Sequence, residues 1–133
     1  MAVPDSLRQS IQRLGTLEGS FYLLSDSSWT FLPESPLFAA IESYGDQAVS
    51  ALVSCLDDIH PAVATVNGRP VYVGVMCYEA LRRFVYYEYW DADIEGYSPD
   101  WLGYIAPTAG PADLHTAKQM WLVVLRNKAY RLG

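Results

Sequence analysis

The stretch YGDQAVSALVSCL, residues 44–56, decides the predicted fold. Gly45 ends one short helix and Asp46 caps the next, because an aspartate at the start of a helix accepts hydrogen bonds from first-turn amides. Two helices joined by so tight a turn must fold back on each other or cross steeply. The apolar residues after the turn follow the i, i+3, i+4, i+7 spacing that places side chains on one helix face: Val49, Leu52, Val53 and Leu56.

Helical patterns continue on both sides of this stretch. Residues 7–14 predict a short amphipathic first helix, and Pro36 opens a helix that runs up to the turn. Residues 73–90 predict the most apolar helix, and apolar groups nearly all round it place it at the centre of the fold. Pro111 starts the last helix. The predicted fold class is therefore mostly α, with residues 1–133 forming a single helical domain.

Two stretches break the helical pattern. The dipeptide Asn67-Gly68 tolerates positive φ at both central positions of a turn, so residues 64–72 predict one short β-hairpin. Pro70 cannot donate to a strand ladder, which makes these strands short and edge-like. A polar turn also separates two aromatic runs over residues 21–32, where a second hairpin or an extended packed loop fits equally well.

The central motif resembles a HEAT-like helical repeat. It is carried by Gly45-Asp46-x-Ala48-Val49-x-x-Leu52-x-x-Cys55-Leu56-Asp57-Asp58 and later by Ala80-Leu81. The wider pattern, over about residues 36 to 130, is similar to uncharacterised bacterial proteins of that kind. The resemblance implies stacked helices and no particular activity. Because the Asn67-Gly68 hairpin stands where a repeat would pass into its next helix, we expect a compact HEAT-like domain rather than a regular solenoid.

The composition of this 133-residue chain limits the classes of partner that it is expected to bind. A net charge of −6 and an isoelectric point near 4.7 oppose nucleic-acid binding, because phosphate backbones are bound by lysine and arginine. A basic protein is the more natural partner. No apolar run approaches the roughly 18 residues of a membrane span, so a soluble protein with no membrane partner is expected. The chain is also long enough to bury a core without a metal or another cofactor.

Cysteine usage and the first residues bear on the cellular compartment. The N-terminal residues lack the charged and apolar regions of a secretory signal. The expected location is the cytoplasm, or the periplasm if a leader has been removed. Cys55 and Cys77 both lie in apolar helical context and form no C-x-x-C pattern. We therefore expect two buried, unpaired thiols rather than a disulfide or a redox pair.

Glu79 is the candidate for a catalytic base. An ionised carboxylate on a nearly apolar helix is costly unless it is paired, and Arg82 and Arg83 lie three and four residues further on. Structural ion pairing is therefore the expected role. The alternative is a hydrolase-like enzyme that uses Glu79 with His60 or Cys77, for which no spacing in the sequence supplies a geometry. No catalytic residue is assigned.

An acidic run imitates half of a calcium-binding loop. Asp91-x-Asp93-x-Glu95-Gly96 alternates oxygen ligands and then supplies the glycine that such a loop requires. The second half fails, because Leu102 stands where the bidentate glutamate would be. We expect a solvated acidic loop and no metal site.

The strongest candidate contact surface is the segment 86–104, which interleaves Tyr and Trp with carboxylates and contains no Lys or Arg. Tyr and Trp anchor interfaces, and carboxylates steer a basic partner. The alternative is that these rings cover the core beneath a long loop. The predicted partner-binding residues in this segment and at the hairpin tip are Tyr89, Trp90, Asp91, Asp93, Glu95, Tyr97, Trp101, Asn67 and Arg69.

These features favour a non-enzymatic, acidic protein-binding domain that engages a basic protein partner. An immunity protein, which neutralises a basic toxin or effector, is one concrete version. Besides the enzyme, a second alternative is a purely structural module that associates with itself through the same aromatic residues. The expected oligomeric state is a monomer or a homodimer.

Overall fold

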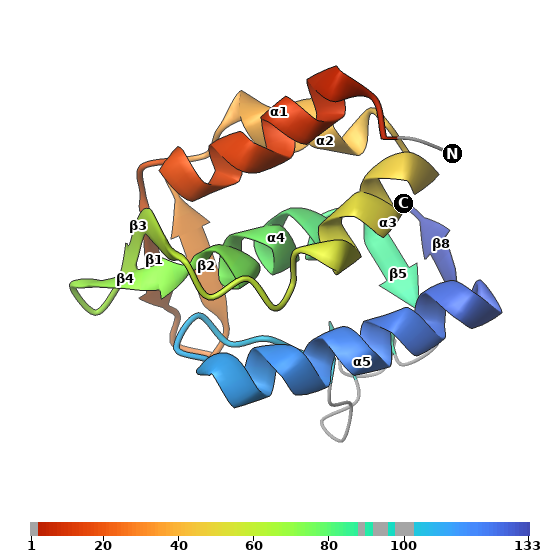
Figure 1. Cartoon of the computed structure of the whole chain (residues 1–133). Coiled ribbons are helices and arrows are strands. Elements are labelled where there is room, and N and C mark those ends of the chain that lie inside the picture. Colours follow the sequence, from red (N-terminus) through yellow and green to blue (C-terminus); the bar gives the residue numbers. More distant parts are fainter. Residues whose placement is uncertain (1–2, 88–89, 92–95, 98–102) are drawn as a thin grey trace.

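The computed structural model describes residues 3–87, 90–91, 96–97 and 103–133. Helices and strands both build it (Figure 1), so the prediction of a mostly α, HEAT-like domain is wrong. The elements in chain order are α1 (Asp5–Arg13), a 3-10 turn (Leu14–Thr16), β1 (Ser20–Leu23), β2 (Trp29–Leu32), α2 (Pro36–Glu42), α3 (Asp46–Ser54), β3 (Pro61–Val66), β4 (Arg69–Tyr72), α4 (Val73–Arg82), β5 (Val85–Tyr87), β6 (Trp90–Asp91), β7 (Gly96–Tyr97), α5 (Pro111–Asn127) and β8 (Tyr130–Leu132).

A four-stranded mixed sheet is the main departure from the predicted fold. Both expected hairpins are present, and they join into one sheet of order β2-β1-β3-β4. The join is a short parallel pairing of β1 with β3, in which Ser20 lies opposite Thr65 and Phe21 opposite Val66. The partners are 45 residues apart in the chain. Sequence periodicity reports local structure and not long-range strand pairing, so the sequence predicted the hairpins but not the sheet that they form together.

The turn between β1 and β2 is built from local polar contacts. Ser27 adopts a left-handed conformation with φ 69°, and its amide donates to the Leu24 carbonyl at 3.0 Å. The Asp26 carboxylate accepts from both the amide and the hydroxyl of Ser28, at 3.0 and 2.6 Å. A three-residue loop with its last residue in this conformation is a common hairpin connection. The hairpin interpretation of residues 21–32 is therefore confirmed over the loop interpretation.

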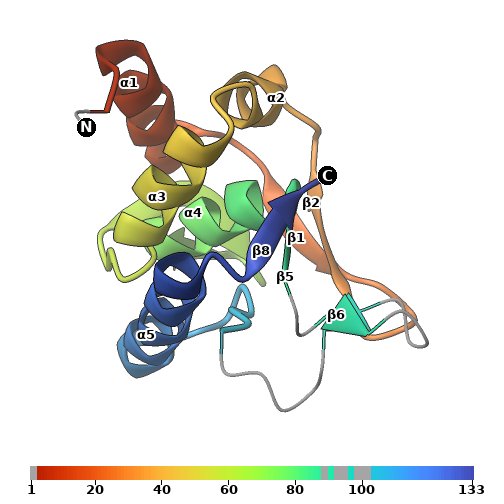
Figure 2. The same cartoon turned by 90° about the vertical axis from the view of Figure 1, so that its right-hand side faces the viewer.

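The predicted central helix is present but shorter than expected. Every residue of α4 from Gly74 to Leu81 is buried, and Figure 1 shows α4 in the middle of the molecule, with the four-stranded sheet at one end and β5 and β8 at the other. The helix ends at Arg82, whereas the prediction continued it to residue 90. Val85–Tyr87 pairs instead with Tyr130–Leu132 as an antiparallel ladder, which Figure 2 shows from the side. A β-branched and two aromatic residues favour this strand.

The predicted capping of α3 by Asp46 is wrong, because Gly45, with φ 60°, is the N-cap, Asp46 is the first helical residue, and no side chain makes a capping hydrogen bond. The Asp46 carboxylate accepts instead from the Tyr130 hydroxyl at 2.9 Å.

Local end signals place α2 and α5 as predicted. Ser35 caps α2, its hydroxyl accepting from the Leu37 amide at 3.2 Å, and Pro36 follows at the first helical position. At α5, Pro111 is again the first residue, and the Asp113 carboxylate accepts from the amide of the preceding glycine at 3.3 Å. Within the described residues, no helix is both long and apolar enough to cross a membrane.

The core is continuous from the sheet to the last helix. On the inner side of the sheet, the Phe31 ring packs against Phe21 at 4.9 Å and against Phe38 of α2 at 5.9 Å between ring centroids. At the other side of α4, Trp121 of α5 is fully buried, and its indole N–H donates to the Gly103 carbonyl at 2.9 Å. The helices therefore cover only the inner face of the sheet.

Candidate binding surface

The predicted aromatic and acidic segment is described only in part. Tyr89, Asp93, Glu95 and Trp101 lie outside the described residues. The remaining members form the small hairpin of β6 and β7, in which Trp90 lies opposite Tyr97 and Asp91 opposite Gly96. As an interface, the segment stays a prediction.

The second part of the predicted surface, the tip of the hairpin between β3 and β4, is confirmed as a tight turn. Asn67 and Gly68 have φ values of 52° and 79°, the left-handed conformation that this dipeptide tolerates. A Cβ atom added at Gly68 would meet nothing within 4 Å, and Asn67 and Arg69 are both exposed. The base of this hairpin is part of the sheet, while the tip projects into solvent (Figure 1).

Glu79 forms structural ion pairs, as expected. Its carboxylate is buried and accepts from Nε of Arg82 and Nε of Arg83, each at 3.0 Å. The Arg83 guanidinium also lies 4.0 Å from the centre of the Phe38 ring and donates to Glu34 at 2.9 Å. That hydrogen bond holds the pKa of the Glu34 carboxyl below its ordinary value. The cluster fixes α4 to α2 rather than exposing a base to substrate.

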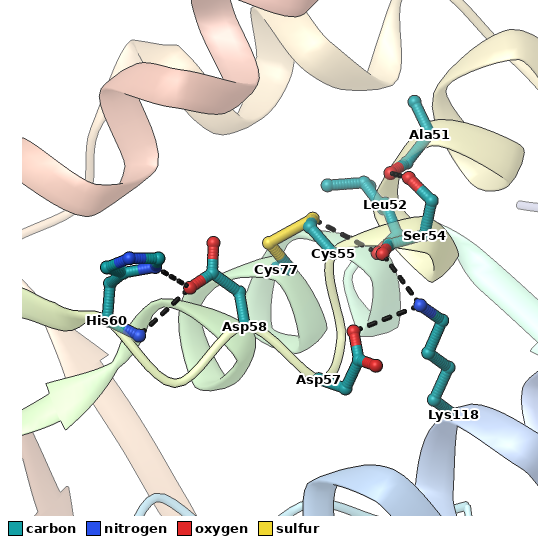
Figure 3. The surroundings of a disulfide bond; sticks show 9 residues. All are labelled: Ala51, Leu52, Ser54, Cys55, Asp57, Asp58, His60, Cys77 and Lys118. Carbon is teal, nitrogen blue, oxygen red and sulfur yellow. Dashed lines mark hydrogen bonds and ion pairs between the residues drawn. A yellow bond between two sulfur atoms is a disulfide. The ribbon is translucent and has the colours of Figure 1, made fainter.

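The other residues of the enzyme alternative are engaged elsewhere. Cys77 is joined to Cys55 by a disulfide, so the expectation of two unpaired thiols is wrong. His60 is exposed, and its Nδ1 lies 2.7 Å from the Asp58 carboxylate (Figure 3). Cys77 and Glu79 are two residues apart on α4, and about 100° per residue places them on opposite sides of the helix. Cys77 is therefore not a free thiol beside Glu79, and His60 is paired with Asp58.

The disulfide belongs to a structural connection at the end of α3. Cys55 is the residue that follows α3, and Cys77 lies fully buried in α4. Beside it, Nζ of Lys118 on α5 donates to the Ser54 carbonyl and lies 3.0 Å from the Asp57 carboxylate (Figure 3). Covalent and ionic contacts thus link three helices around one point. Within the described residues, no group of three or more His, Cys, Asp or Glu side chains could hold a metal ion.

An uncharged row of side chains crosses the outer face of the four-stranded sheet. Ser20 lies opposite Leu32 on β2 and opposite Thr65 on β3, and Thr65 in turn lies opposite Pro70 on β4. The Ser20 and Thr65 hydroxyl oxygens are 2.8 Å apart, so both side chains are on the same face. Their neighbours along β1 and β3 are buried in the core. Because side chains alternate between the faces of a strand, this row faces outward.

Three large apolar side chains stand next to this row. Tyr22, Leu32 and Val63 are 53%, 47% and 51% exposed, and Thr30 lies opposite Tyr22 on the neighbouring strand. We name the outer surface of the sheet the sheet face and define it by Ser20, Tyr22, Thr30, Leu32, Val63, Thr65 and Pro70. None of these side chains carries a charge.

Three carboxylates lie close in sequence to the ends of β1 and β2. Asp26 is in the β1–β2 turn, Glu34 follows β2, and Glu18 precedes β1; all three are exposed. The Ser28 hydroxyl, and then its amide, lower the pKa of the Asp26 carboxyl. The sequence did not predict this surface, because Tyr22 and Leu32 belong to two aromatic runs whose buried and exposed sides are not marked. In the sequence, Tyr22 and Leu32 each follow a phenylalanine, Phe21 and Phe31, and this alternation could have indicated a strand with a buried and an exposed side.

No protein-family model matches this sequence, and neither a curated protein nor a solved structure matches it. The resemblance to HEAT-like proteins therefore gains no support from a relative, and the mixed sheet contradicts the stacked-helix architecture that it implied.

Proposed function

We propose that this chain is a non-enzymatic protein-binding domain whose contact surface is the sheet face. The observation that carries the proposal is the uncharged sheet face itself, on which Tyr22, Leu32 and Val63 are about half exposed. Antiparallel and mixed sheets with one solvated face usually alternate apolar and polar residues so that the solvated face is hydrophilic. Depletion of charge together with exposed aromatic and apolar groups is typical of interface centres.

The charge of the chain supports a basic protein as the partner. The net charge is −6. Glu18 is exposed just before β1 and Asp26 in the β1–β2 turn, whereas the exposed Glu34 after β2 is paired with Arg83. Exposed carboxylates near an uncharged patch fit the usual anatomy of an interface, in which polar residues lie at the rim of an apolar core. They also accelerate the encounter with a positively charged surface. Neutralisation of a basic toxin or effector, as an immunity protein performs it, is the concrete version that we favour.

The bonds that Glu79, His60 and Cys77 already make within the protein support a binding role over the hydrolase-like alternative. Each has a structural partner, and Cys77 cannot act as a thiol while it is in a disulfide. That disulfide also favours an oxidising compartment such as the periplasm over the cytoplasm, because cytosolic thiols are kept reduced. The aromatic and acidic segment 86–104 stays a second predicted contact that could extend the same interface.

Comparative affinity capture tests the proposal. The tagged chain is used to recover proteins from its native host, in three forms: unmodified, Tyr22→Ala/Val63→Ala, and the control Val123→Ala/Leu132→Ala. The control residues are also exposed apolar side chains, on α5 and β8, away from the sheet. We expect a basic protein with the unmodified and control forms, and at least about a tenfold weaker affinity for the sheet-face variant.

The comparison of the two double variants decides the outcome. If both bind the recovered partner equally well, the sheet face is not the contact surface. Charge reversal of Asp91, which lies in β6, then tests the aromatic and acidic segment in its place. Circular dichroism of each variant confirms that it is folded before the affinities are compared.

A further inference from the structure

The β1–β2 hairpin extends beyond the sheet to which it belongs. β1 pairs with β3 only at Ser20 and Phe21, whereas its pairing with β2 continues to Leu23, which lies opposite Trp29. Among the described residues, the outer half of the hairpin is therefore a ribbon of two strands with no third strand beside it. Figure 2 shows this hairpin extending on the side of the molecule away from α3 and α5.

The outer half of the hairpin is apolar on both of its faces. Leu23 and Leu24 are 60% and 45% exposed, and they follow the half-exposed Tyr22 of the sheet face. Because side chains alternate along a strand, Leu23 points to the opposite face from its two neighbours. On that face it lies opposite the half-buried Trp29. The inner row of side chains, which is fully covered at Phe31, thus becomes exposed toward the turn.

A single carboxylate supplies the charge at the apex. Asp26 is the one charged residue between residues 19 and 33, and it is exposed in the turn. Hydrogen bonds from Ser28 lower the pKa of its carboxyl, so it is ionised at neutral pH. Within the described residues this carboxylate takes part in no ion pair. We name Leu23, Leu24, Asp26 and Trp29 the β1–β2 tip.

The β1–β2 tip is held in one conformation before any partner arrives. The Leu24 amide donates to the Ser28 carbonyl at 2.8 Å, and the Leu24 carbonyl accepts from the Ser27 amide at 3.0 Å. A preorganised loop loses little conformational entropy when it binds. The exposed leucines are therefore presented at fixed positions on either side of the ribbon.

The charge of the β1–β2 tip disfavours two other occupants. A second copy of the chain would bring the same carboxylate and the same net charge of −6 to the contact, and like charges oppose association. An anionic lipid surface repels a chain of this charge. Asp26 at the apex would also have to enter the apolar layer first, and burial of an unpaired carboxylate is costly. A basic protein gains from the same carboxylate.

We propose that the β1–β2 tip inserts into an apolar cleft of the basic partner. Leu23 would face one wall of the cleft and Leu24 the other, while Asp26 would meet a lysine or arginine at its floor. A flat surface could cover only one face of the ribbon, which is why the two-sided exposure requires a cleft. This inference rests on the proposed function and specifies the shape of the partner's site, since Tyr22 continues the contact onto the sheet face.

Photocross-linking from both faces tests this inference. The photoreactive residue p-benzoylphenylalanine replaces Leu23 in one form of the chain, Leu24 in a second form and Val123 of α5 in a control form; all three side chains are exposed. Each form is irradiated in an extract of the native host. We expect one basic protein to be cross-linked from both leucine positions, at a yield at least about tenfold above that of the control. Peptide mapping should place the two cross-links on different segments of that protein, as the two walls of a cleft require.

Removal of the charge at the apex tests the expected cation. Asp26→Asn keeps an oxygen acceptor for Ser28 but removes the negative charge. Glu42→Gln is the matched control, because Glu42 is an exposed carboxylate at the end of α2. We expect Asp26→Asn to bind the cross-linked partner at least about fivefold more weakly than Glu42→Gln at about 0.05 M NaCl. The difference should fall below about twofold at about 0.5 M NaCl, because exposed charges are screened. Thermal unfolding verifies that both variants are folded.

The following results would overturn the inference: no protein cross-linked from the β1–β2 tip, cross-links from only one of the two leucine positions, or equal affinities of Asp26→Asn and Glu42→Gln. Cross-links between two copies of the chain would identify a second copy as the occupant. Sedimentation of the chain with vesicles of phosphatidylcholine and phosphatidylglycerol, if Leu23→Ser/Leu24→Ser abolishes it, would identify a lipid surface. Both results overturn the inference as well. The proposed function fails separately, if Tyr22→Ala/Val63→Ala retains the native partner.

Discussion

Breaking the bond between Cys55 and Cys77 should cost this domain a large part of its stability. The two cysteines are 22 residues apart, and the loop they close contains β3, β4 and the start of α4. In the chain-entropy account, a cross-link over this length removes about 11 cal/mol/K from the unfolded state, which is about 3.4 kcal/mol at 25 °C. Domains are typically stable by only about 5–15 kcal/mol.

Reduction isolates this entropic contribution better than substitution does. It keeps both sulfur atoms in place, and a buried thiol behaves as a small apolar group, so Cys77 should remain packed in the core. Replacement of both cysteines by alanine would add the cost of a cavity. Reduction should therefore lower the free energy of unfolding by about 3 kcal/mol and leave the folded structure intact.

Urea unfolding with and without a reductant measures this loss. With a slope near 2 kcal/mol/M, the midpoint should fall by about 1.5–2 M, and the slope should rise because the reduced unfolded chain is more extended. Cys55→Ala/Cys77→Ala serves as the control, since its midpoint should not respond to reductant. A midpoint that stays within about 0.3 M after complete reduction, as verified by mass, would refute the cross-link argument.

Single substitutions test three features: the buried ion pair of Glu79, the close approach of Gly74 to a neighbouring backbone, and the raised pKa of Tyr130. Arg83→Ala should lower the free energy of unfolding in urea by about 3 kcal/mol, because it leaves a buried carboxylate less well paired. Arg82→Ala should lower it less, since Arg82 is more exposed and, among the described residues, forms its ion pair with that carboxylate alone. Gly74→Ala should lower the free energy of unfolding by about 2–3 kcal/mol, because the added Cβ would lie 2.1 Å from a backbone oxygen. Gly15→Ala is the control: its Cβ would make an ordinary contact, so the free energy of unfolding should change by less than about 0.5 kcal/mol. Burial, and then a carboxylate partner, raise the pKa of Tyr130 to about 12 from its ordinary 10.0. From about pH 10 upward the unfolded phenol ionises first, so thermal stability should fall more steeply with pH in the unmodified chain than in Tyr130→Phe.

Helix ends were predictable because their signals are local. Ser35 and Pro36 begin α2, and Pro111 begins α5, each through contacts within a few residues. The positive φ angles at Asn67 and Gly68 followed from the dipeptide alone. In each case the hydrogen-bonding groups that decide the structure lie within one turn of the chain.

Strand pairing between distant segments was not predictable in this way. Ser20 and Thr65 meet across β1 and β3 although each is an ordinary polar residue in its own segment. The predicted end of the central helix is wrong for a related reason. Val85 and its aromatic neighbours continue a helical apolar pattern, but they pair with the last residues of the chain instead. Tertiary pairing overrides a local pattern when both states bury the same side chains.

The sheet face could be recognised only after the layers were known. An alternation such as Phe21-Tyr22 indicates two faces of a strand but not which of them the protein covers. The disulfide was missed for the same reason, because Cys55 and Cys77 come close only when the end of α3 packs on α4, where their Cα atoms are 6.2 Å apart. The predicted contact segment, in contrast, depends on composition alone and is still to be tested.

The register between β1 and β3 decides whether the sheet face can act as a binding surface. A shift by one residue would turn Phe21 outward and Ser20 into the core, because side chains alternate with a period of two. The 2.8 Å contact between the Ser20 and Thr65 hydroxyls exists only in the observed register. These hydroxyls therefore stabilise the correct pairing while they interrupt what would otherwise be a continuous apolar stripe from Leu32 to Pro70. Replacing Ser20 and Thr65 by valine should leave the sheet paired but increase self-association, since their polarity opposes non-specific adhesion of the sheet face.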